Sequence, residues 1–398
     1  MYRAALAAVD GRALVADHLR RHPLRSSFSG LAVGKAAAAM AWGLLDAQGG
    51  ALRRLLVVTR HGHGGDIATA HAGLTLVEAG HPLPDAASLQ AGRDLRALLD
   101  EMPPEESFVC LISGGASALL ELPRPGVTLD ELRRVNRWLL GAGLSIRDMN
   151  AVRCGLSTLK CGGLLRHLAG RRVCGLLISD VPGDDPAVIG SGLLAAPRAG
   201  SLPPDLPPWL KNLLARAQTG EPAPPPPAPA LHILATNFHA RQAAEAAARA
   251  MGYAVRNHDG LLTCEVAEAA RRIAAALVRE PGVLHLWGGE VSLRLPPRPG
   301  RGGRCQHLAL MVARELRIQG RRAWSLLAAG SDGSDGPGEV AGALVDGGTL
   351  ARARDAGLDV VDCLRRADAG HLLAGTGDLV VTGPTGTNVM DLVLGIMV

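Results

Sequence analysis

Short apolar runs alternate with Ala- and Leu-rich segments of helical periodicity along most of this 398-residue chain. Continuous apolar runs, rather than alternating apolar and polar residues, are typical of strands buried on both faces. Strands of this kind, joined by helices, form parallel sheets with helices packed on each side. The pattern therefore predicts an α/β protein with a doubly wound, three-layer α/β/α architecture.

The predicted elements keep one order, in which nearly every strand is followed by a helix. Strands are predicted at 31–33, 55–59, 74–78, 108–112, 173–178, 231–235, 253–256, 283–287, 291–295, 323–328 and 379–382. Helices are predicted at 36–48, 85–99, 128–141, 149–160, 162–168, 209–217, 238–251, 265–280 and 306–319.

A proline-rich stretch divides this pattern in two. Ten prolines lie between residues 203 and 229, and proline clusters favour extended connectors because they cannot donate to a sheet. A chain of this length also exceeds the size at which a single core stops growing. We therefore predict a first domain at 1–200, a connector at 201–230 and a second, unequal domain at 231–398, with a cleft between the domains.

Charge and cysteine content bear on the class of protein. The formal net charge is +5 and the 42 basic residues are scattered, so no nucleic-acid partner is expected. The seven cysteines show no CxxC spacing, which predicts reduced thiols, such as Cys110 and Cys174 in apolar runs, rather than a disulfide framework. No apolar run approaches the roughly 20 residues that span a bilayer. We expect a cytoplasmic protein without a membrane partner, and consider a homodimer as its assembly.

Two strand ends in the first half carry charged side chains. Lys35 lies where a strand gives way to a helix, and the positive end of a helix dipole favours phosphate. Asp180 follows the strand at 173–178 after one serine, close to the arrangement by which Walker-B-like sites hold Mg²⁺. The alternatives are a solvated first-turn lysine and plain turn residues, the role that we expect for Asp184 and Asp185.

A third strand end carries small residues. Ser113 and Ser117 flank Gly114 and Gly115 after the strand at 108–112. Backbone N–H groups at glycines can approach an anion closely, so this loop is predicted to hold phosphate. The segment lacks the Gly-x-Ser-x-Gly pattern of a serine nucleophile. A tight βα turn with a helix cap is the alternative.

In the second half, Glu290 and Arg304 follow paired glycines. A carboxylate at the end of an apolar strand is costly unless it is paired or bound to a metal, so Glu290 is a candidate Mg²⁺ ligand. Arg304 precedes a helix and is placed for a two-point contact with carboxylate or phosphate.

Two further glycine-rich loops add acidic and amide groups. Asp332 and Asp335 follow the strand at 323–328, where one carboxylate could act as a base and the other as a metal ligand or a helix cap. The loop after the strand at 379–382 offers Thr385 and Asn388 to a ligand. Each turn alone is compatible with a purely structural role; their common placement after strands favours a site.

Four histidines lie close together in sequence, which raises the question of a zinc site. His61, His63, His71 and His81 have loop-like spacing without an HExxH motif, so a metal role is disfavoured. His81 could line a substrate pocket. The segment from His81 to Asp85 contains two prolines and predicts a rigid turn with Asp85 as a helix cap.

These segments occur in an order that resembles the bacterial and archaeal glycerate 2-kinase family, whose C-terminal half is called the MOFRL domain. The matching segments are Gly34-Lys35-Ala36, Gly80-His81-Pro82-Leu83-Pro84-Asp85, Ser113-Gly114-Gly115-Ala116-Ser117, Ser179-Asp180-Val181-Pro182-Gly183-Asp184, Gly288-Gly289-Glu290, Gly302-Gly303-Arg304, Asp332-Gly333 and Thr382 to Asn388. The resemblance implies a Rossmann-like N-terminal domain and a second α/β domain with a mixed sheet. It also implies transfer of phosphate from ATP, with Mg²⁺, to the 2-hydroxyl of D-glycerate.

The resemblance also implies roles for particular residues. Lys35 and Arg304 would offset charge on the transferring phosphoryl group and the substrate carboxylate, and Asp180 or Glu290 would hold Mg²⁺. Asp332 or Asp180 would take the hydroxyl proton. The 113–117 loop, Glu290, Thr385 and Asn388 would bind ATP or substrate.

The chain departs from the pattern of the family at several positions. The residues that replace the usual ones are Cys154, Cys161, Cys305, His307, Glu339 and Met390. A kinase for another small hydroxy acid and a non-catalytic ligand-binding homologue are therefore alternatives. An NAD-linked hydroxypyruvate reductase is a third, although no Gly-x-Gly-x-x-Gly fingerprint follows a strand.

Overall fold

The computed structural model describes residues 1–24, 26–168, 170–195, 202–217 and 229–398. By their internal contacts these residues form two compact units. Asp10–Leu234 make up the N-terminal unit, and Ala235–Val398 make up the C-terminal unit together with Met1–Val9. The first nine residues therefore pack with the second half of the chain. Residue 201 and residues 218–228 of the predicted connector lie outside the described residues.

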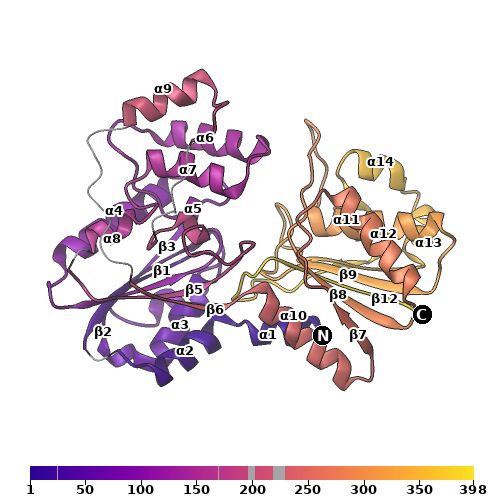
Figure 1. The fold of residues 1–398 in the computed structure, drawn as a ribbon, viewed down its shortest axis with the longest axis horizontal. Helices are drawn as coiled ribbons and strands as arrows, with labels where there is room; N and C mark the ends of the chain where they lie inside the picture. The colour runs from indigo at the N-terminus through magenta and orange to yellow at the C-terminus, as the bar shows by residue number, and fades with distance from the viewer. Residues whose placement is uncertain (25, 169, 196–201, 218–228) are drawn as a thin grey trace. The chain divides into compact units, whose positions relative to one another are not determined.

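The N-terminal unit is built on a six-stranded sheet with the order β3-β2-β1-β4-β5-β6 (Figure 1). Its strands are β1 (Phe28–Val33), β2 (Leu52–Arg60), β3 (Leu74–Ala79), β4 (Ser107–Ile112), β5 (Val173–Ile178) and β6 (Ala230–Ala235). Strands β1 to β5 pair in parallel. Chain order runs outward in one direction from β1 and in the other from β4. This reversal makes the β1/β4 pair the topological switch point, where open α/β sheets bind ligands.

Helices cover both faces of this sheet, as predicted. The helices are α2 (Gly11–Arg21), α3 (Ala37–Gln48), α4 (Ala86–Glu101), α5 (Ala116–Leu119), α6 (Leu129–Gly141), α7 (Ile146–Leu156), α8 (Gly163–His167) and α9 (Pro208–Ala217), with short 3₁₀ turns η1 (Gly49–Ala51), η2 (Ile67–Thr69) and η3 (Ile189–Ser191). Figure 1 shows α2 and α3 on one face and α4, α5 and α8 on the other. Helices α6, α7 and α9 share a separate apolar cluster that includes Leu139, Leu156 and Leu210.

The C-terminal unit has a mixed six-stranded sheet with the order β11-β10-β9-β12-β8-β7. Its elements are α1 (Tyr2–Ala8), α10 (Asn237–Ala250), β7 (Ala254–Asn257), α11 (Val266–Arg279), β8 (Val283–Gly289), α12 (Arg304–Ile318), β9 (Trp324–Gly330), β10 (Gly342–Asp346), α13 (Thr349–Asp355), α14 (Val360–Arg365), α15 (Ala369–Thr376), β11 (Leu379–Val380) and β12 (Asp391–Met397). Only β7 and β8 pair in parallel among the pairs described. Helices α11 and α12 cover one face and α10 the other, so this unit is also three-layered (Figure 1).

Most predicted elements are present within one to three residues of their expected bounds, and one strand is wrong. Residues 291–295 form no strand, because the chain after β8 makes only an isolated bridge through Ser292. Strands β10 and β12 and helices α1, α2, α5, α13, α14 and α15 were not predicted. In the described part of the chain no helix combines the length and apolarity needed to cross a membrane.

Candidate active site

The loops after β1 and β4 are joined at the switch point of the N-terminal unit. The backbone N–H of Lys35 donates to the carbonyl of Gly114 at 2.8 Å, and that of Ala36 donates to Ser113 Oγ at 3.1 Å. A Cβ at Gly34, where φ is +125°, would collide with Ser113. Only glycine therefore lets these two loops pack so closely. Ser113 is fully buried and serves this junction.

Lys35 and His81 border the glycine-rich loop. A Cβ built on Gly115 would lie 3.3 Å from Lys35 Cγ and 3.2 Å from His81 Cδ2. The predicted phosphate loop, the predicted lysine and His81 therefore meet at one edge of the sheet. Asp85 caps α4, as predicted, by accepting from the backbone N–H of Ser88 at 3.0 Å.

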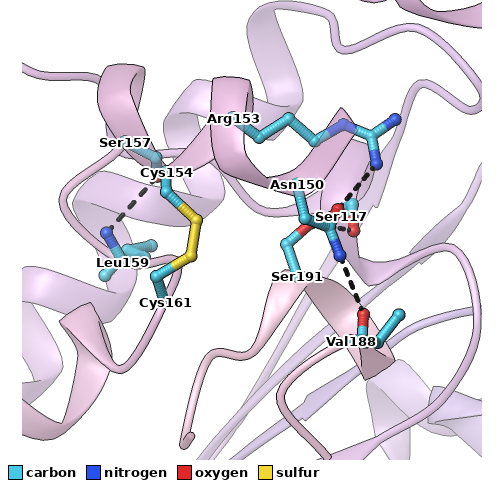
Figure 2. The surroundings of a disulfide bond; sticks show 9 residues. All are labelled: Ser117, Asn150, Arg153, Cys154, Ser157, Leu159, Cys161, Val188 and Ser191. Atoms are coloured by element: carbon cyan, nitrogen blue, oxygen red, sulfur yellow. Dashed lines mark hydrogen bonds between the residues drawn. A yellow bond between two sulfur atoms is a disulfide. The ribbon is translucent and has the colours of Figure 1, made fainter. Parts of the chain in front are cut away.

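Ser117 is part of a polar network that reaches α7. Its Oγ lies 2.6 Å from the Oγ of Ser191, which in turn donates to Asn150 Oδ1 at 2.9 Å. The Arg153 guanidinium donates to the same oxygen at 3.1 Å, and burial lowers the pKa of Arg153 to about 10. Figure 2 shows these side chains converging. Only Ser117 among them was predicted.

Asp180 lies two residues beyond β5, the strand next to β4, and so belongs to the same sheet edge. The neighbouring aspartates have the turn roles expected of them. Asp185 accepts from the backbone N–H of Ala187 at 3.0 Å and pairs with Arg147, and Asp184 occupies a turn with φ of 51°.

Arg304 is the first residue of α12 in the C-terminal unit. Its Nε and Nη2 donate to the two oxygens of Asp391, at 2.6 and 3.1 Å, and its Nη1 pairs with Glu290. Burial alone would lower the pKa of Arg304, but Asp391 and Glu290 outweigh it and raise that pKa well above its ordinary value. Arg304 is thus a fixed cation held by two carboxylates. Glu290 is exposed rather than buried at the end of β8.

Asp335 caps α12. Its carboxylate accepts from the backbone N–H groups of Cys305 at 3.0 Å and Gln306 at 2.9 Å, and from the Gln306 amide at 2.9 Å. Burial, with the nearby Asp391 charge, raises the pKa of Asp335 to about 6. Asp335 therefore positions the helix that begins with Arg304, the capping role considered for it from sequence.

Replacing Asp335 with alanine is expected to lower the free energy of unfolding by about 2 kcal/mol, because two buried N–H groups lose their acceptor. Asp335→Asn should lose less, since it keeps one acceptor and removes a charge that burial disfavours. Asp359 caps α14 through two N–H groups at an exposed position, so Asp359→Ala should cost about 1 kcal/mol or less. Urea unfolding of the three variants measures this, and equal losses for Asp335→Ala and Asp359→Ala would contradict the assignment.

Asp332 is buried beside β9 and accepts from the backbone N–H and the hydroxyl of Ser334, at 2.9 and 3.1 Å. Tyr2, on α1, reaches this loop and donates its hydroxyl to the Gly330 carbonyl at 2.6 Å. Burial, together with Cys305, Asp332 and Asp391, raises the pKa of Tyr2. Sequence analysis missed Tyr2 because no local pattern links the N-terminus to a loop 328 residues away.

The loop before β12 packs on the same region. Thr385 Oγ1 donates to the carbonyl of Ser331, and the backbone N–H of Val389 donates to Ser331 Oγ at 2.8 Å. Asn388 is buried. The C-terminal unit thus brings together Arg304, Asp332, Thr385 and Asn388 around the ends of β8, β9 and β12.

The comparisons with known proteins match these features. A family model described as a domain of unknown function (DUF4147) matches residues 1–201, and one described as the MOFRL family matches residues 283–391. A D-glycerate 2-kinase from Thermotoga maritima is 34% identical over 92% of this chain and 90% of its own length. The chain belongs to the glycerate 2-kinase family.

Two further comparisons bear on fold and activity. A crystal structure of a glycerate kinase from Thermotoga maritima matches with a TM-score of 0.81 at 30% identity, over 100% of this chain and 97% of that chain. A protein from Agrobacterium vitis, provisionally named a hydroxypyruvate reductase, is 35% identical over 98% of this chain and 92% of its own length. The predicted α/β class and family are confirmed.

The role of Asp180 or Glu290 in binding Mg²⁺ stays a prediction. Among the described residues, no three His, Cys, Asp or Glu side chains gather as a metal-binding group. Carboxylate oxygens suit Mg²⁺, which commonly takes one or two protein carboxylates and completes its shell with water and phosphate oxygens. The donor chemistry of both residues therefore fits.

The positions that depart from the family pattern include one pair that sequence analysis interpreted wrongly. Cys154 and Cys161 form a disulfide bond (Figure 2), whereas only free thiols were expected. The sequence spacing of these two cysteines matches no common motif. Their proximity depends on the end of a helix and on the turn that follows it. Cys110 and Cys174 are free, as expected.

His307, another departure, lies inside α12, and burial lowers its pKa to about 4. Its Nδ1 has no hydrogen-bond partner among the described residues. Between pH 6.5 and pH 4, His307 binds a proton in the unfolded chain but not in the folded protein. Its contribution to the free energy of unfolding is therefore complete above pH 6.5 and decreases as the pH falls.

This lowered pKa of His307 predicts a loss of about 2 kcal/mol in the free energy of unfolding by pH 5. His307→Gln should lose less stability than the wild type over that range. Urea unfolding of both proteins at pH 7 and pH 5 gives the change in the free energy of unfolding of each. Asp335 titrates in the opposite sense in both proteins, so its contribution cancels when the two changes are compared. His371→Gln, at an exposed position, is the control. Identical pH slopes for His307→Gln and wild type would contradict the prediction.

Proposed function

We propose that this protein transfers the γ-phosphoryl group of ATP to the 2-hydroxyl of D-glycerate, giving 2-phosphoglycerate. The observation that carries the proposal is the position of Lys35 at the β1/β4 switch point, beside the N-terminus of the 12-residue helix α3. Open α/β sheets bind ligands at such a point. Relatives named glycerate 2-kinase, from a bacterium and an archaeon, support the same substrate.

The N-terminal unit supplies groups suited to a phosphorylated ligand. Phosphoryl transfer depends mainly on positioning and electrostatic stabilisation. Lys35 is a point charge that offsets the negative charge of the transferring group, and the Gly114-Gly115 backbone leaves room for phosphate oxygens. Ser117 is the last polar side chain of this loop. The hydrogen bonds between the two loops preorganise it.

The C-terminal unit supplies Arg304, a cation that suits an acidic substrate, and Asp391, a buried carboxylate. Asp391 fixes the orientation of Arg304 through two hydrogen bonds. Glu290 is the more exposed of the two Arg304 partners, so a substrate carboxylate or phosphate would exchange with Glu290 and leave Asp391 in place. Thr385 and Asn388 line the same loop cluster and would contact substrate or nucleotide.

A base must accept the proton of the 2-hydroxyl, and two carboxylates are candidates. Asp332, in the C-terminal unit, is held by Ser334 and lies near Tyr2. Asp180, in the N-terminal unit, lies two residues beyond β5. Bound Mg²⁺, held by Asp180 or Glu290, would neutralise charge on the phosphate oxygens.

The direct test offers D-glycerate, L-glycerate and other small 2-hydroxy acids with ATP and Mg²⁺ and measures ADP release. ADP formed with D-glycerate, and a product identified as 2-phosphoglycerate by phosphorus NMR, is the expected result. The absence of ADP release with every acid would contradict the proposal and favour the alternative of a non-catalytic homologue. ADP release with another hydroxy acid alone would identify a kinase of different substrate.

The name carried by the Agrobacterium vitis relative motivates one further arm. Incubation with hydroxypyruvate and NADH should leave the near-ultraviolet absorbance of NADH unchanged. Steady oxidation of NADH in this arm would favour a reductase instead.

A further inference from the structure

The disulfide between Cys154 and Cys161 joins the last turn of α7 to the segment that leads into α8. The Cα atoms lie 5.7 Å apart, within the range of about 4.4–6.8 Å that disulfides span. Both cysteines are half-buried rather than enclosed. A small thiol or disulfide in solution can therefore reach them. The other five cysteines are free.

The disulfide completes a ring of bonds around the end of α7. The backbone N–H of Cys161 donates to the carbonyl of Ser191 at 2.9 Å. The side chain of Ser191 donates to Asn150 at 2.9 Å. Asn150 lies four residues before Cys154 on α7, so the two share one helix face. Breaking the sulfur–sulfur bond opens this ring on one side (Figure 2).

The backbone within the ring depends on its contacts. Cys161 and Ser191 have positive φ angles of 55° and 59°, a region that residues with side chains populate only at a cost in free energy. Gly190 and Gly192, on either side of Ser191, also have positive φ. Such conformations persist where the surroundings hold them, and the disulfide is one of the bonds that holds Cys161.

The ring acts on the glycine-rich loop through one hydrogen bond. The hydroxyl of Ser191 lies 2.6 Å from that of Ser117, in the short helix that follows Gly114 and Gly115. A loss of conformational order at Ser191 therefore reaches the glycine-rich loop at the switch point through residues of the N-terminal unit. All of these residues belong to the N-terminal unit.

We propose that Cys154 and Cys161 are a thiol–disulfide modification site that controls the order of Ser191 and Ser117. Its reactant is a low-molecular-weight disulfide such as oxidised glutathione. One cysteine thiolate attacks the reagent, forming a mixed disulfide and releasing one reduced glutathione; the second thiolate then displaces the other. Two thiol protons are released to the two glutathione thiolates, the cysteines are oxidised, and the reagent is reduced.

Amide hydrogen exchange tests the coupling without relying on the proposed activity. Wild-type protein is oxidised with oxidised glutathione or reduced with dithiothreitol, and thiols are counted by alkylation and mass spectrometry. We expect five alkylated cysteines in the oxidised protein and seven in the reduced protein. Peptides covering residues 187–193 and 113–119 should exchange about tenfold faster after reduction, because a disulfide typically restrains the local opening of its loop.

Variants identify the bond responsible. Cys154→Ser and Cys161→Ser should exchange at the fast rate under both treatments, whereas Cys174→Ser should behave like wild type. Seven alkylated cysteines after oxidation would overturn the site. Equal exchange of both peptides in the oxidised and reduced proteins would overturn its control over Ser191 and Ser117.

The effect on turnover rests on the proposed function and is measured separately. Oxidised wild type should have a KM for ATP or D-glycerate several-fold lower than the reduced protein, and Cys161→Ser should keep the reduced value under both treatments. Absent turnover in both redox states, with the exchange difference present, would contradict glycerate phosphorylation and leave the redox site standing. Turnover with equal KM values in both states would overturn control of the substrate loop.

Discussion

Replacing Lys35 with alanine is expected to lower kcat for D-glycerate phosphorylation by about 10³-fold, the scale of losing one charged group that stabilises a phosphoryl-transfer transition state. The backbone N–H of Lys35 joins the two loops at the switch point, and the substitution keeps this N–H. The substitution should therefore leave the fold and the melting temperature nearly unchanged. Steady-state assay of ADP release, with thermal unfolding of the same sample, measures both effects.

The chain supplies a matched control for Lys35. It has only three lysines: Lys35, Lys160, which is buried against Glu121, and Lys211, which is exposed on α9. Lys211→Ala removes the same charge away from the switch point and should keep full activity. Lys35→Arg should recover part of kcat, because it restores the charge with a different shape. Wild-type turnover in Lys35→Ala would remove the assigned role of Lys35.

Much of the fold follows from local sequence, and the failures share a physical cause. Strand β5 agrees with its prediction at both ends because a continuous apolar run is bounded by polar residues. The strand predicted at 291–295 is wrong because this segment makes only an isolated bridge, between Ser292 and Glu265. Strand β12 was missed although it is a continuous apolar run, because it pairs antiparallel with β8 and β9 and so departs from the alternation of strands and helices on which the prediction was based.

The candidate functional residues of the two units divide in the same way. Lys35, Arg304 and Asp332 follow glycine turns after strands, so their placement at strand ends could be predicted from sequence. Asp391 and Tyr2 could not. Asp391 contacts Arg304 across 87 positions of sequence, and Tyr2 belongs to an N-terminal helix that packs with the distant C-terminal half. Tertiary contacts alone bring both to the site.

Replacing Arg304 with alanine is expected to lower kcat/KM by about 10³-fold, since a two-point cation for a carboxylate or phosphoryl group is lost. This change also leaves Asp391 buried without its partner, which typically costs about 3–5 kcal/mol. A loss of activity alone would then be ambiguous. The double variant Arg304→Ala, Asp391→Asn removes the stranded charge, so it should recover stability in urea unfolding while remaining inactive.

Substitution of Glu290 separates two roles that the contacts allow. If Glu290 only pairs with Arg304, Glu290→Gln weakens a competitor of the substrate, so the KM for D-glycerate should fall while the Mg²⁺ dependence stays the same. If Glu290 holds Mg²⁺, the same variant should require about tenfold more Mg²⁺ for half-maximal turnover, the scale of losing one metal-ligand contact. Titration of Mg²⁺ at saturating ATP decides between the two. Exposed Glu290 is a weaker anchor for Arg304 than buried Asp391 is. We therefore expect the first result, a lower KM with unchanged Mg²⁺ dependence. Asp180 would then be the metal ligand to test next.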